Sequence, residues 1–239
     1  RGKLQAGETV LVNGASGGVG LAAVGLAKAL GAKTVLAGLT SPGKADAVKA
    51  AGADAVKFQT FKAEHVVTSN AKKAAYQIAN THEAGSQIDM IRKLELSFDQ
   101  FRELAAVTAK AGIDFLSTAF DRESLSFLAN DLKIERLKIP SGELTNGPYL
   151  LDCARLRLPM IMSTGMCTLA EVREALDVIA YGLATEGTPA GMADFAEFSD
   201  SPDGRAALKD MVTLLHCTTE YPTPVEDVNL RAMETMATQ

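Results

Sequence analysis

Residues 114–140 read DFLSTAFDRESLSFLANDLKIERLKIP, and this stretch contains the unit that decides the fold. The near-continuous apolar run Asp114–Thr118 predicts a strand that is buried on both faces. The amphipathic stretch Arg122–Asn130 predicts a helix, and the apolar run Leu137–Pro140 predicts the next strand. A strand, a helix and a strand in this order indicate parallel strands that are joined by a right-handed crossover.

The same unit recurs along the whole 239-residue chain. The other predicted strands are Val10–Asn13, Thr34–Ala37, Ala55–Phe58, Met160–Thr164 and Thr213–Cys217. The other predicted helices are Val19–Leu30, Lys44–Ala51, Ile88–Ala111, Thr145–Arg155 and Leu169–Ala180. This alternation predicts an α/β fold, a TIM-barrel-like (β/α) parallel sheet that begins with a Rossmann-like βαβ unit.

The predicted sheet is incomplete, because about seven strands are found where a closed barrel of this type has eight. A missing strand leaves unpaired edges that invite pairing with another chain. We therefore expect a homo-oligomer.

Composition excludes several classes of function. The net charge is −5 and there is no basic run, which argues against nucleic acid or an anionic membrane as the main partner. No apolar run reaches the roughly 18 residues of a membrane span. Cys153, Cys167 and Cys217 are widely spaced and form no CxxC motif. We therefore expect a cytoplasmic protein without a disulfide framework or a zinc knuckle.

Two long connections interrupt the repeat. Gln59–Gln87 is polar and is predicted to form an active-site loop. Thr185–Arg205 is rich in Gly, Pro, Asp and Ser, and is predicted to be a surface insertion. The character of the chain changes at Thr40–Gly43. We therefore divide it into a βαβ segment, 1–42, and a barrel portion, 43–239, within one continuous domain.

A glycine-rich turn, NGASGGVG at residues 13–20, follows the first predicted strand and opens a helix. In this context glycines let backbone N–H groups approach a pyrophosphate at the helix N-terminus. The predicted second strand is not followed by an acidic residue that would hold a ribose diol. Ser41 and Lys44 lie there instead and favour a 2′-phosphate. The candidate NADP(H)-binding residues are thus Gly14, Gly17, Gly18, Gly20, Ser41 and Lys44. The alternative is a tight turn without a ligand.

Residues 4–38 resemble the cofactor-binding βαβ unit of quinone reductases in the medium-chain dehydrogenase family. The resemblance is carried by GETVLV at 7–12, GASGGVG at 14–20 and AKALGA at 27–32. It implies that this segment binds NADP(H).

Reactive side chains gather at the carboxyl ends of the later strands. In a (β/α) barrel these positions converge on the face where active sites are built. Two lysines and several hydroxyls on one cavity predict an anionic substrate, a phosphate or a carboxylate. Each residue also has a simpler interpretation, since a lysine can extend to solvent and a serine can cap a helix. The residues concerned are Lys57, Gln59, Ser117, Thr118, Lys138, Ser141, Glu143, Ser163, Thr164, His216 and Thr218.

The same strand ends resemble the sialic acid synthase family, over about residues 43–236. The motifs are AGADAVKFQTF at 51–61, FLSTAFD at 115–121, KIPSGE at 138–143, MSTGM at 162–166 and LLHCT at 214–218. The resemblance implies a transferase that condenses phosphoenolpyruvate with an N-acyl hexosamine and releases phosphate. It also implies a divalent metal, typically manganese.

The resemblance further implies a role for each matching residue. Lys57 and Lys138 would bind the carboxylate and the phosphate of phosphoenolpyruvate, Gln59 would orient the sugar, and His216 would be one of two metal ligands. The hydroxyl residues that would bind substrate are Thr118, Ser141, Ser163 and Thr164.

Other features depart from that family. Its first-strand glutamate and the segment with the second metal histidine are not found, and the dehydrogenase-like segment occupies the position of the first strand. His65 and His82 are interpreted as surface histidines and not as substitutes. We therefore expect a chimera, natural or engineered, with impaired synthase activity. The alternatives are a chimera without catalysis and an NADP(H)-binding module.

Overall fold

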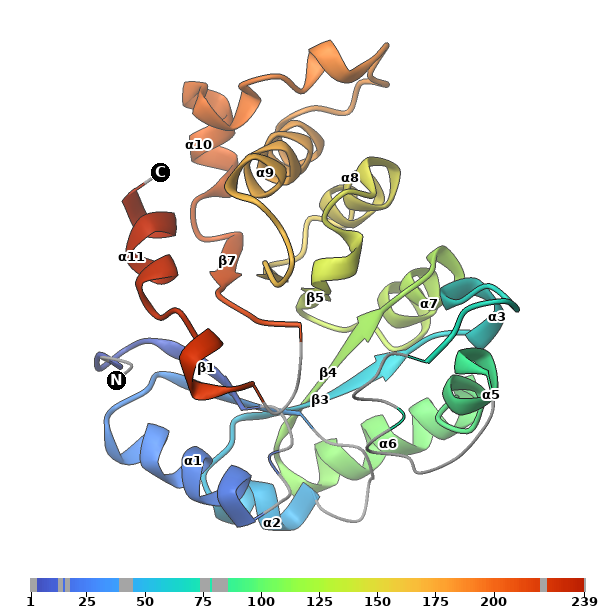
Figure 1. The fold of residues 1–239 in the computed structure, drawn as a ribbon, viewed down its shortest axis with the longest axis vertical. Coiled ribbons are helices and arrows are strands. Elements are labelled where there is room, and N and C mark those ends of the chain that lie inside the picture. Colours follow the sequence, from blue (N-terminus) through green and yellow to red (C-terminus); the bar gives the residue numbers. More distant parts are fainter. Residues whose placement is uncertain are drawn as a thin grey trace.

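In the computed structural model, one parallel sheet organises the chain. The structure describes residues 4–12, 15, 18–38, 45–73, 78, 86–219 and 223–238. Within these, seven strands pair in chain order, each with the next. The strands are β1 Thr9–Val12, β2 Thr34–Gly38, β3 Ala55–Thr60, β4 Asp114–Ala119, β5 Leu137–Ile139, β6 Met160–Ser163 and β7 Val212–Leu215. The predicted incomplete TIM-barrel-like sheet is therefore confirmed (Figure 1).

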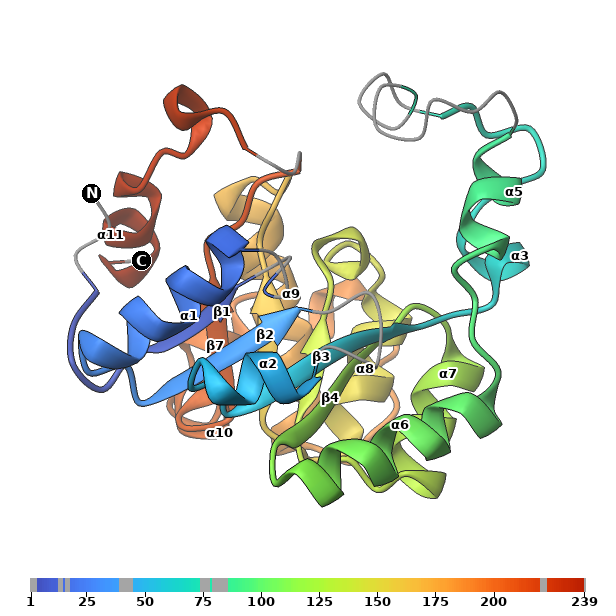
Figure 2. The ribbon, with the colours of Figure 1, turned by 90° about the horizontal axis from the view of Figure 1, so that it is seen from below.

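Helices cover the outer face of this sheet, which curls into a half-barrel (Figures 1 and 2). Helices α3 and α5 extend away from the strands (Figure 2). The helices are α1 Gly18–Ala29, α2 Ala45–Ala50, α3 Ala63–Val66, α5 Gln87–Arg92, α6 Phe98–Ala111, α7 Arg122–Ser126, α8 Gly147–Arg155, α9 Leu169–Ala184, α10 Pro202–Leu208 and α11 Arg231–Thr238. A π-helical turn, Phe127–Asp131, continues α7.

The inner face of the sheet is apolar toward the amino ends of the strands. Leu36, Ala55, Leu116 and Ile161 form a buried cluster there, and Leu11 of β1 and Leu215 of β7 pack against it. Both edge strands therefore contribute side chains to one interior layer. Side chains alternate between the two faces of a strand, so every second residue points inward. After Ala55 on β3 the next inward residues are Lys57 and Gln59, and after Leu116 on β4 the next is Thr118. The interior thus changes from apolar to polar along each of these two strands.

The predicted helix Ile88–Ala111 is wrong as one element, because the chain breaks between Arg92 and Phe98. Ser97 caps α6 by accepting a hydrogen bond from Gln100 N (3.2 Å), and the Gln100 side chain accepts one from Ser97 N (2.8 Å). This capping box fixes a new helix start. Within the break, the Glu95 carboxylate accepts a hydrogen bond from Ala63 N (2.9 Å), which joins the break to α3.

The predicted surface insertion Thr185–Arg205 packs against α9 more closely than expected. Phe195 is 9% exposed and meets the Tyr181 ring edge-on at 5.1 Å. Asp177 of α9 is buried, and its carboxylate accepts hydrogen bonds from the backbone N (2.8 Å) and the hydroxyl (2.5 Å) of Ser199. The segment also continues into α10, which was not predicted; neither was α11.

The first segment continues the same sheet. Strand β1 pairs with β2, and β2 pairs with β3 through Leu36↔Ala55 and Gly38↔Lys57. The division at residue 42 stays a prediction. Among the described helices, none has the length and apolar character needed to cross a membrane.

Candidate functional site

A cavity of about 660 Å³ lies at the carboxyl ends of the strands. This volume is within the usual range for small-molecule sites. Six of the predicted catalytic and substrate-binding residues line it: Lys57, Gln59, Thr118, Lys138, Ser141 and Ser163. The remaining lining residues are Leu11, Gln87, Phe120, Pro140, Met166, Cys217, Thr218 and Thr219.

Strand register brings three of these side chains into one row. Gln59 is paired with Thr118 across β3 and β4, and Thr118 is paired with Lys138 across β4 and β5. Lys57 lies two positions before Gln59 on β3, and so it points to the same face. Together these four side chains place two amines, an amide and a hydroxyl on one surface of the cavity.

Burial changes the protonation of both lysines. Desolvation lowers the pKa of Lys57 to about 8. Lys138 is 6% exposed. Desolvation, with a smaller contribution from the positive charge of Lys57, lowers its pKa to about 7. Lys138 Nζ donates to the carbonyl of Ile139 at 2.7 Å, which holds the amine at the strand end. An anion in the cavity would favour the charged form of both amines.

The other polar groups of the cavity come from the strand ends of β5, β6 and β7. Ser141 begins the short 3₁₀ turn Ser141–Glu143 after β5. Ser163 ends β6, and its hydroxyl accepts a hydrogen bond from the Cys217 thiol at 3.3 Å. The cavity thus presents hydrogen-bond donors from several different strands, which suits recognition of a small anion with several oxygens.

Two predicted site residues are placed elsewhere. The hydroxyl of Thr164 donates to the Leu215 carbonyl at 3.0 Å and does not line the cavity. The His216 ring is also outside the lining, and its Nε2 lies 2.7 Å from the Val228 carbonyl oxygen. Each side chain is engaged by a backbone carbonyl, one at the end of β7 and one in the segment that follows it. Local sequence pattern offers no means of locating either partner.

The described residues around His216 do not complete the implied metal site. The Val228 carbonyl engages Nε2, which leaves Nδ1 as the ring nitrogen that a metal could use. Among the residues that the structure describes, His216 belongs to no group of three His, Cys, Asp or Glu side chains with converging ligand atoms. We therefore derive no step through a metal at His216.

The glycine turn can be followed only in part. Gly18 and Gly20 lie in the first turn of α1, the next helix after β1. Gly14, Gly17, Ser41 and Lys44 lie outside the described residues, as does His82. NADP(H) binding stays a prediction.

Both ends of the predicted active-site loop Gln59–Gln87 line the cavity, and Gln87 is the first residue of α5. Sequence reasoning missed other cavity residues: Phe120 directly follows β4, and Met166 lies in the turn after β6. Cys217 lies directly after the predicted residue His216, and a strict alternation of side chains along the strand end could have indicated it.

The comparisons with known proteins agree with this arrangement. The model of the NeuB family matches residues 45–239. The chain is 45% identical to an N,N'-diacetyllegionaminic acid synthase from Legionella pneumophila over 191 residues, which are 80% of this chain and 48% of that protein. It is 28% identical to the human N-acetylneuraminate-9-phosphate synthase over 186 residues, which are 77% of this chain and 44% of that protein. The chain thus spans about half the length of the curated relatives it matches.

Solved structures share the fold. A sialic acid synthetase from Leptospira borgpetersenii superposes with a TM-score of 0.61 at 20% identity, over 98% of this chain and 61% of that chain. A spore coat polysaccharide biosynthesis protein from Bacillus subtilis gives a TM-score of 0.56 at 23% identity, over 99% of this chain and 51% of that chain. With a family match that covers most of its length and a polar cavity at the strand ends, the chain belongs to the NeuB family.

Proposed function

We propose that the cavity binds phosphoenolpyruvate and that the chain is the synthase portion of an enzyme that condenses it with an N-acyl hexosamine. The relatives named above are synthases of legionaminic and neuraminic acids, which supports a substrate of this class. The observation that carries the proposal is the pair of inward-facing lysines, Lys57 and Lys138, among hydroxyls in one cavity.

In the proposed reaction, a carbon–carbon bond forms between the methylene carbon of phosphoenolpyruvate and the aldehyde carbon of the sugar. Water adds to the adjacent carbon and phosphate leaves. Lys57 and Lys138 would hold the carboxylate and the phosphate, and Thr118, Ser141 and Ser163 would donate to phosphate oxygens. Fixed cations of this kind stabilise charge that develops in the transition state. Since the pKa of Lys138 is about 7, this amine can take up or release a proton near neutral pH.

Binding is tested apart from turnover, because the chain covers only part of its relatives. We expect isothermal titration with phosphoenolpyruvate to give one site per chain. Lys138→Met should weaken binding at least about tenfold, because a charge-assisted hydrogen bond is worth about 1.5–3 kcal/mol. Lys110→Met is the matched control, since Lys110 is exposed on α6, remote from the residues that line the cavity.

Equal affinity of the Lys138→Met variant and the unaltered chain would overturn the assignment of the cavity.

Turnover is assayed separately, with phosphoenolpyruvate and N-acyl hexosamines. The prediction from the sequence is that this synthase activity is impaired. Binding without turnover would support that prediction, whereas full turnover would contradict it.

The other predictions from the sequence gain no support from the described residues. NADP(H) binding and the chimera interpretation both concern the first segment, which lies before the family match. Manganese dependence, the cytoplasmic location and the homo-oligomer also stay predictions.

A further inference from the structure

A second cavity, of about 390 Å³, lies beside the first, and Phe120 lines both. Its polar lining comes mainly from the segments that follow β3, β4 and β5. The polar side chains are those of His65, Asp121, Arg122, Glu143, Asn146 and Tyr149. Neither the synthase chemistry proposed above nor any predicted role uses His65 or Asp121.

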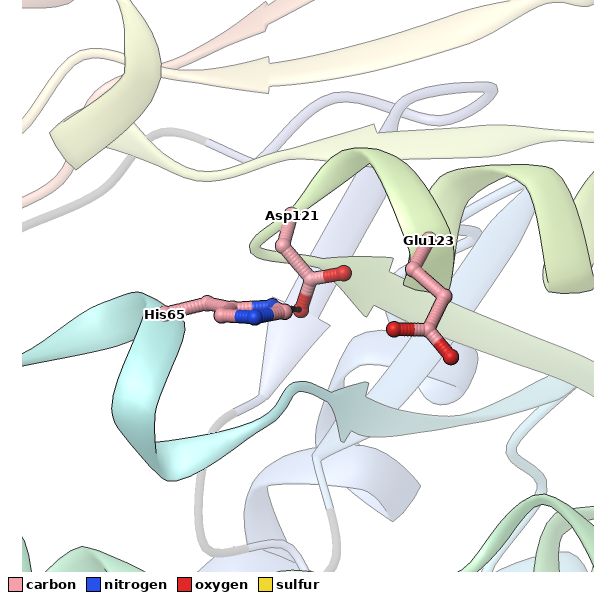
Figure 3. Close-up of side chains that lie close together, drawn as sticks. All are labelled: His65, Asp121 and Glu123. Carbon is pink, nitrogen blue, oxygen red and sulfur yellow. Dashed lines mark ion pairs between the residues drawn. The ribbon is translucent and has the colours of Figure 1, made fainter.

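Three potential metal ligands converge at the rim of this second cavity. His65 lies on α3, Asp121 directly precedes α7, and Glu123 lies in the first turn of α7. One ligand atom from each residue lies within 4.8 Å of the other two. Figure 3 shows the His65 ring directed at the Asp121 carboxylate, with the Nδ1 and Oδ2 atoms 3.9 Å apart.

Asp121 is held in place before any ligand binds. Its Oδ1 accepts a hydrogen bond from Ser124 N at 2.7 Å, and its Oδ2 accepts from the Ser124 hydroxyl at 2.9 Å and from Lys62 N at 3.2 Å. The last bond ties the segment before α3 to the start of α7. The position of His65 relative to Asp121 is therefore fixed by backbone, while the exposed His65 and Glu123 side chains can adjust their rotamers.

The basic side chains nearest in sequence to these ligands are engaged with other carboxylates. Lys62 pairs with Glu95 at 3.5 Å, and Arg122 pairs with Asp152 at 2.6 Å. Within the described residues, Glu123 has no ion pair. The three ligands are thus one imidazole and two carboxylates. Asp121 is near His65, and the Glu123 carboxylate has no cationic partner of its own among the described residues.

We propose that His65, Asp121 and Glu123 bind one divalent transition-metal ion at the rim of the second cavity. An imidazole with two carboxylates suits Zn²⁺, Co²⁺ and Mn²⁺ better than Ca²⁺ or Mg²⁺, which prefer oxygen ligands alone. The ion would join the segments after β3 and β4. Because two of its ligands line the cavity, its remaining coordination positions would face that space and take water or an anionic oxygen.

The required movement is small. Ligand atoms bound to one tetrahedral ion at about 2.0–2.1 Å are about 3.4 Å apart. The ligand atoms lie up to 4.8 Å apart, so a change of rotamer at His65 and Glu123 closes the site. The alternative to a bound metal is a simple ion pair between a protonated His65 and Asp121. The experiment below separates metal binding from such an ion pair.

The probe is Co²⁺ alone, added to the full chain, because its visible absorption distinguishes nitrogen and oxygen ligands from cysteine thiolate. We expect one Co²⁺ per chain with no thiolate charge-transfer band. His65→Ala and Glu123→Gln should each weaken Co²⁺ binding by more than about tenfold. Loss of a residue that only hydrogen-bonds a metal ligand already weakens metal binding by about tenfold or more, and a direct ligand should matter at least as much. Bound Co²⁺ should also raise the melting temperature of the unaltered chain.

Glu64→Gln is the matched control, because Glu64 is the neighbouring carboxylate on α3 and is paired with Arg92. It should leave the Co²⁺ affinity within about twofold, as should His216→Ala. Unchanged affinity in both the His65→Ala and Glu123→Gln variants would overturn the proposal. Absence of binding to the folded chain would also overturn it, and so would loss of binding in the His216→Ala variant alone.

Discussion

At the scale of single residues, the main feature is that two lysines point into a half-barrel whose deeper interior is apolar. Lys138 lies beside Ile139 in a three-residue strand in which all residues are buried. A charged amine there loses hydration, and the neighbouring amine of Lys57 adds repulsion, so its pKa falls to about 7. Such an environment disfavours the charged amine in the free protein and favours the binding of an anion.

The affinity for phosphoenolpyruvate should depend on pH through these amines. The pKa values are about 7 for Lys138 and about 8 for Lys57, so between pH 7 and 9 both amines lose their protons in the free chain. An anion binds the protonated forms, and affinity should therefore fall as pH rises from 7 to 9, with proton uptake on binding. The phosphate of the ligand is almost fully ionised over this range, since its second pKa is about 6.

Titration calorimetry in two buffers of different ionisation enthalpy measures that proton uptake. In the Lys138→Met variant the uptake near pH 7.5 should decrease. A Kd that is constant from pH 7 to 9, with no proton uptake, would contradict the lowered pKa values.

The Lys138 amine should also make the free energy of unfolding depend on pH. Stability should increase as pH rises, whereas the affinity for phosphoenolpyruvate should decrease. A lysine whose pKa is lower in the folded than in the unfolded chain binds fewer protons when folded. Its burial is destabilising below pH 7, and the penalty is relieved as pH rises from about 7 toward 10.5.

At the scale of elements, helices α8 and α9 approach closely at Gly182. A Cβ atom at this position would lie 2.7 Å from the Ala154 Cβ and 3.0 Å from Leu151 Cδ1. The first atom belongs to a side chain that cannot move independently of its backbone. The contact therefore requires glycine, although glycine lowers helix stability by up to about 1 kcal/mol relative to alanine.

Gly182→Ala should destabilise the protein by about 1–3 kcal/mol, because the overpacking of α8 against α9 exceeds the gain in helix propensity. This corresponds to a fall in melting temperature of several degrees. Gly147→Ala, in the first turn of α8, is the control, because a Cβ there meets nothing within 4 Å. A Gly182→Ala variant as stable as the control would mean that the two helices can separate at little cost.

At the scale of the whole molecule, the first two strands and the later five form one sheet around one interior layer. Leu36 of β2 is fully buried against Ala55, Leu116 and Ile161. Because this layer draws side chains from both segments, we expect a single cooperative unfolding unit. In the described sheet, β1 and β7 each have one neighbouring strand. These unpaired edges are the basis of the homo-oligomer prediction.

Leu36→Ala should therefore lower the stability of the whole chain by about 2–5 kcal/mol. All four tyrosines lie after residue 43, so their fluorescence reports on the later portion alone, while far-UV circular dichroism reports on the whole chain. Both signals should shift to the same lower denaturant midpoint. Leu26→Ala, at a 60% exposed position on α1, is the control. A tyrosine transition that Leu36→Ala leaves unchanged would show that the first segment unfolds separately.

Much of the fold could be predicted from local pattern. The seven strands were placed within about two residues at each end, because strands buried on both faces are near-continuous apolar runs whose ends are polar or glycine-rich. Six cavity residues could be found for the same reason, since the carboxyl ends of parallel strands meet at one face. These features depend only on neighbouring residues and on the rule that parallel strands align.

Tertiary structure decided the features that depend on residues far apart in the chain. The engagement of His216 by Val228 needs the turn after β7, and the approach of His65 to Asp121 needs strands β3 and β4 to be adjacent. The pKa of Lys138 depends on burial and on Lys57, which lies on another strand. Sequence by itself determined which segments become strands and which polar groups end them, because hydrophobic periodicity is local. Only the tertiary structure decided which side chains meet, because strand register and desolvation exist only once the sheet has curled.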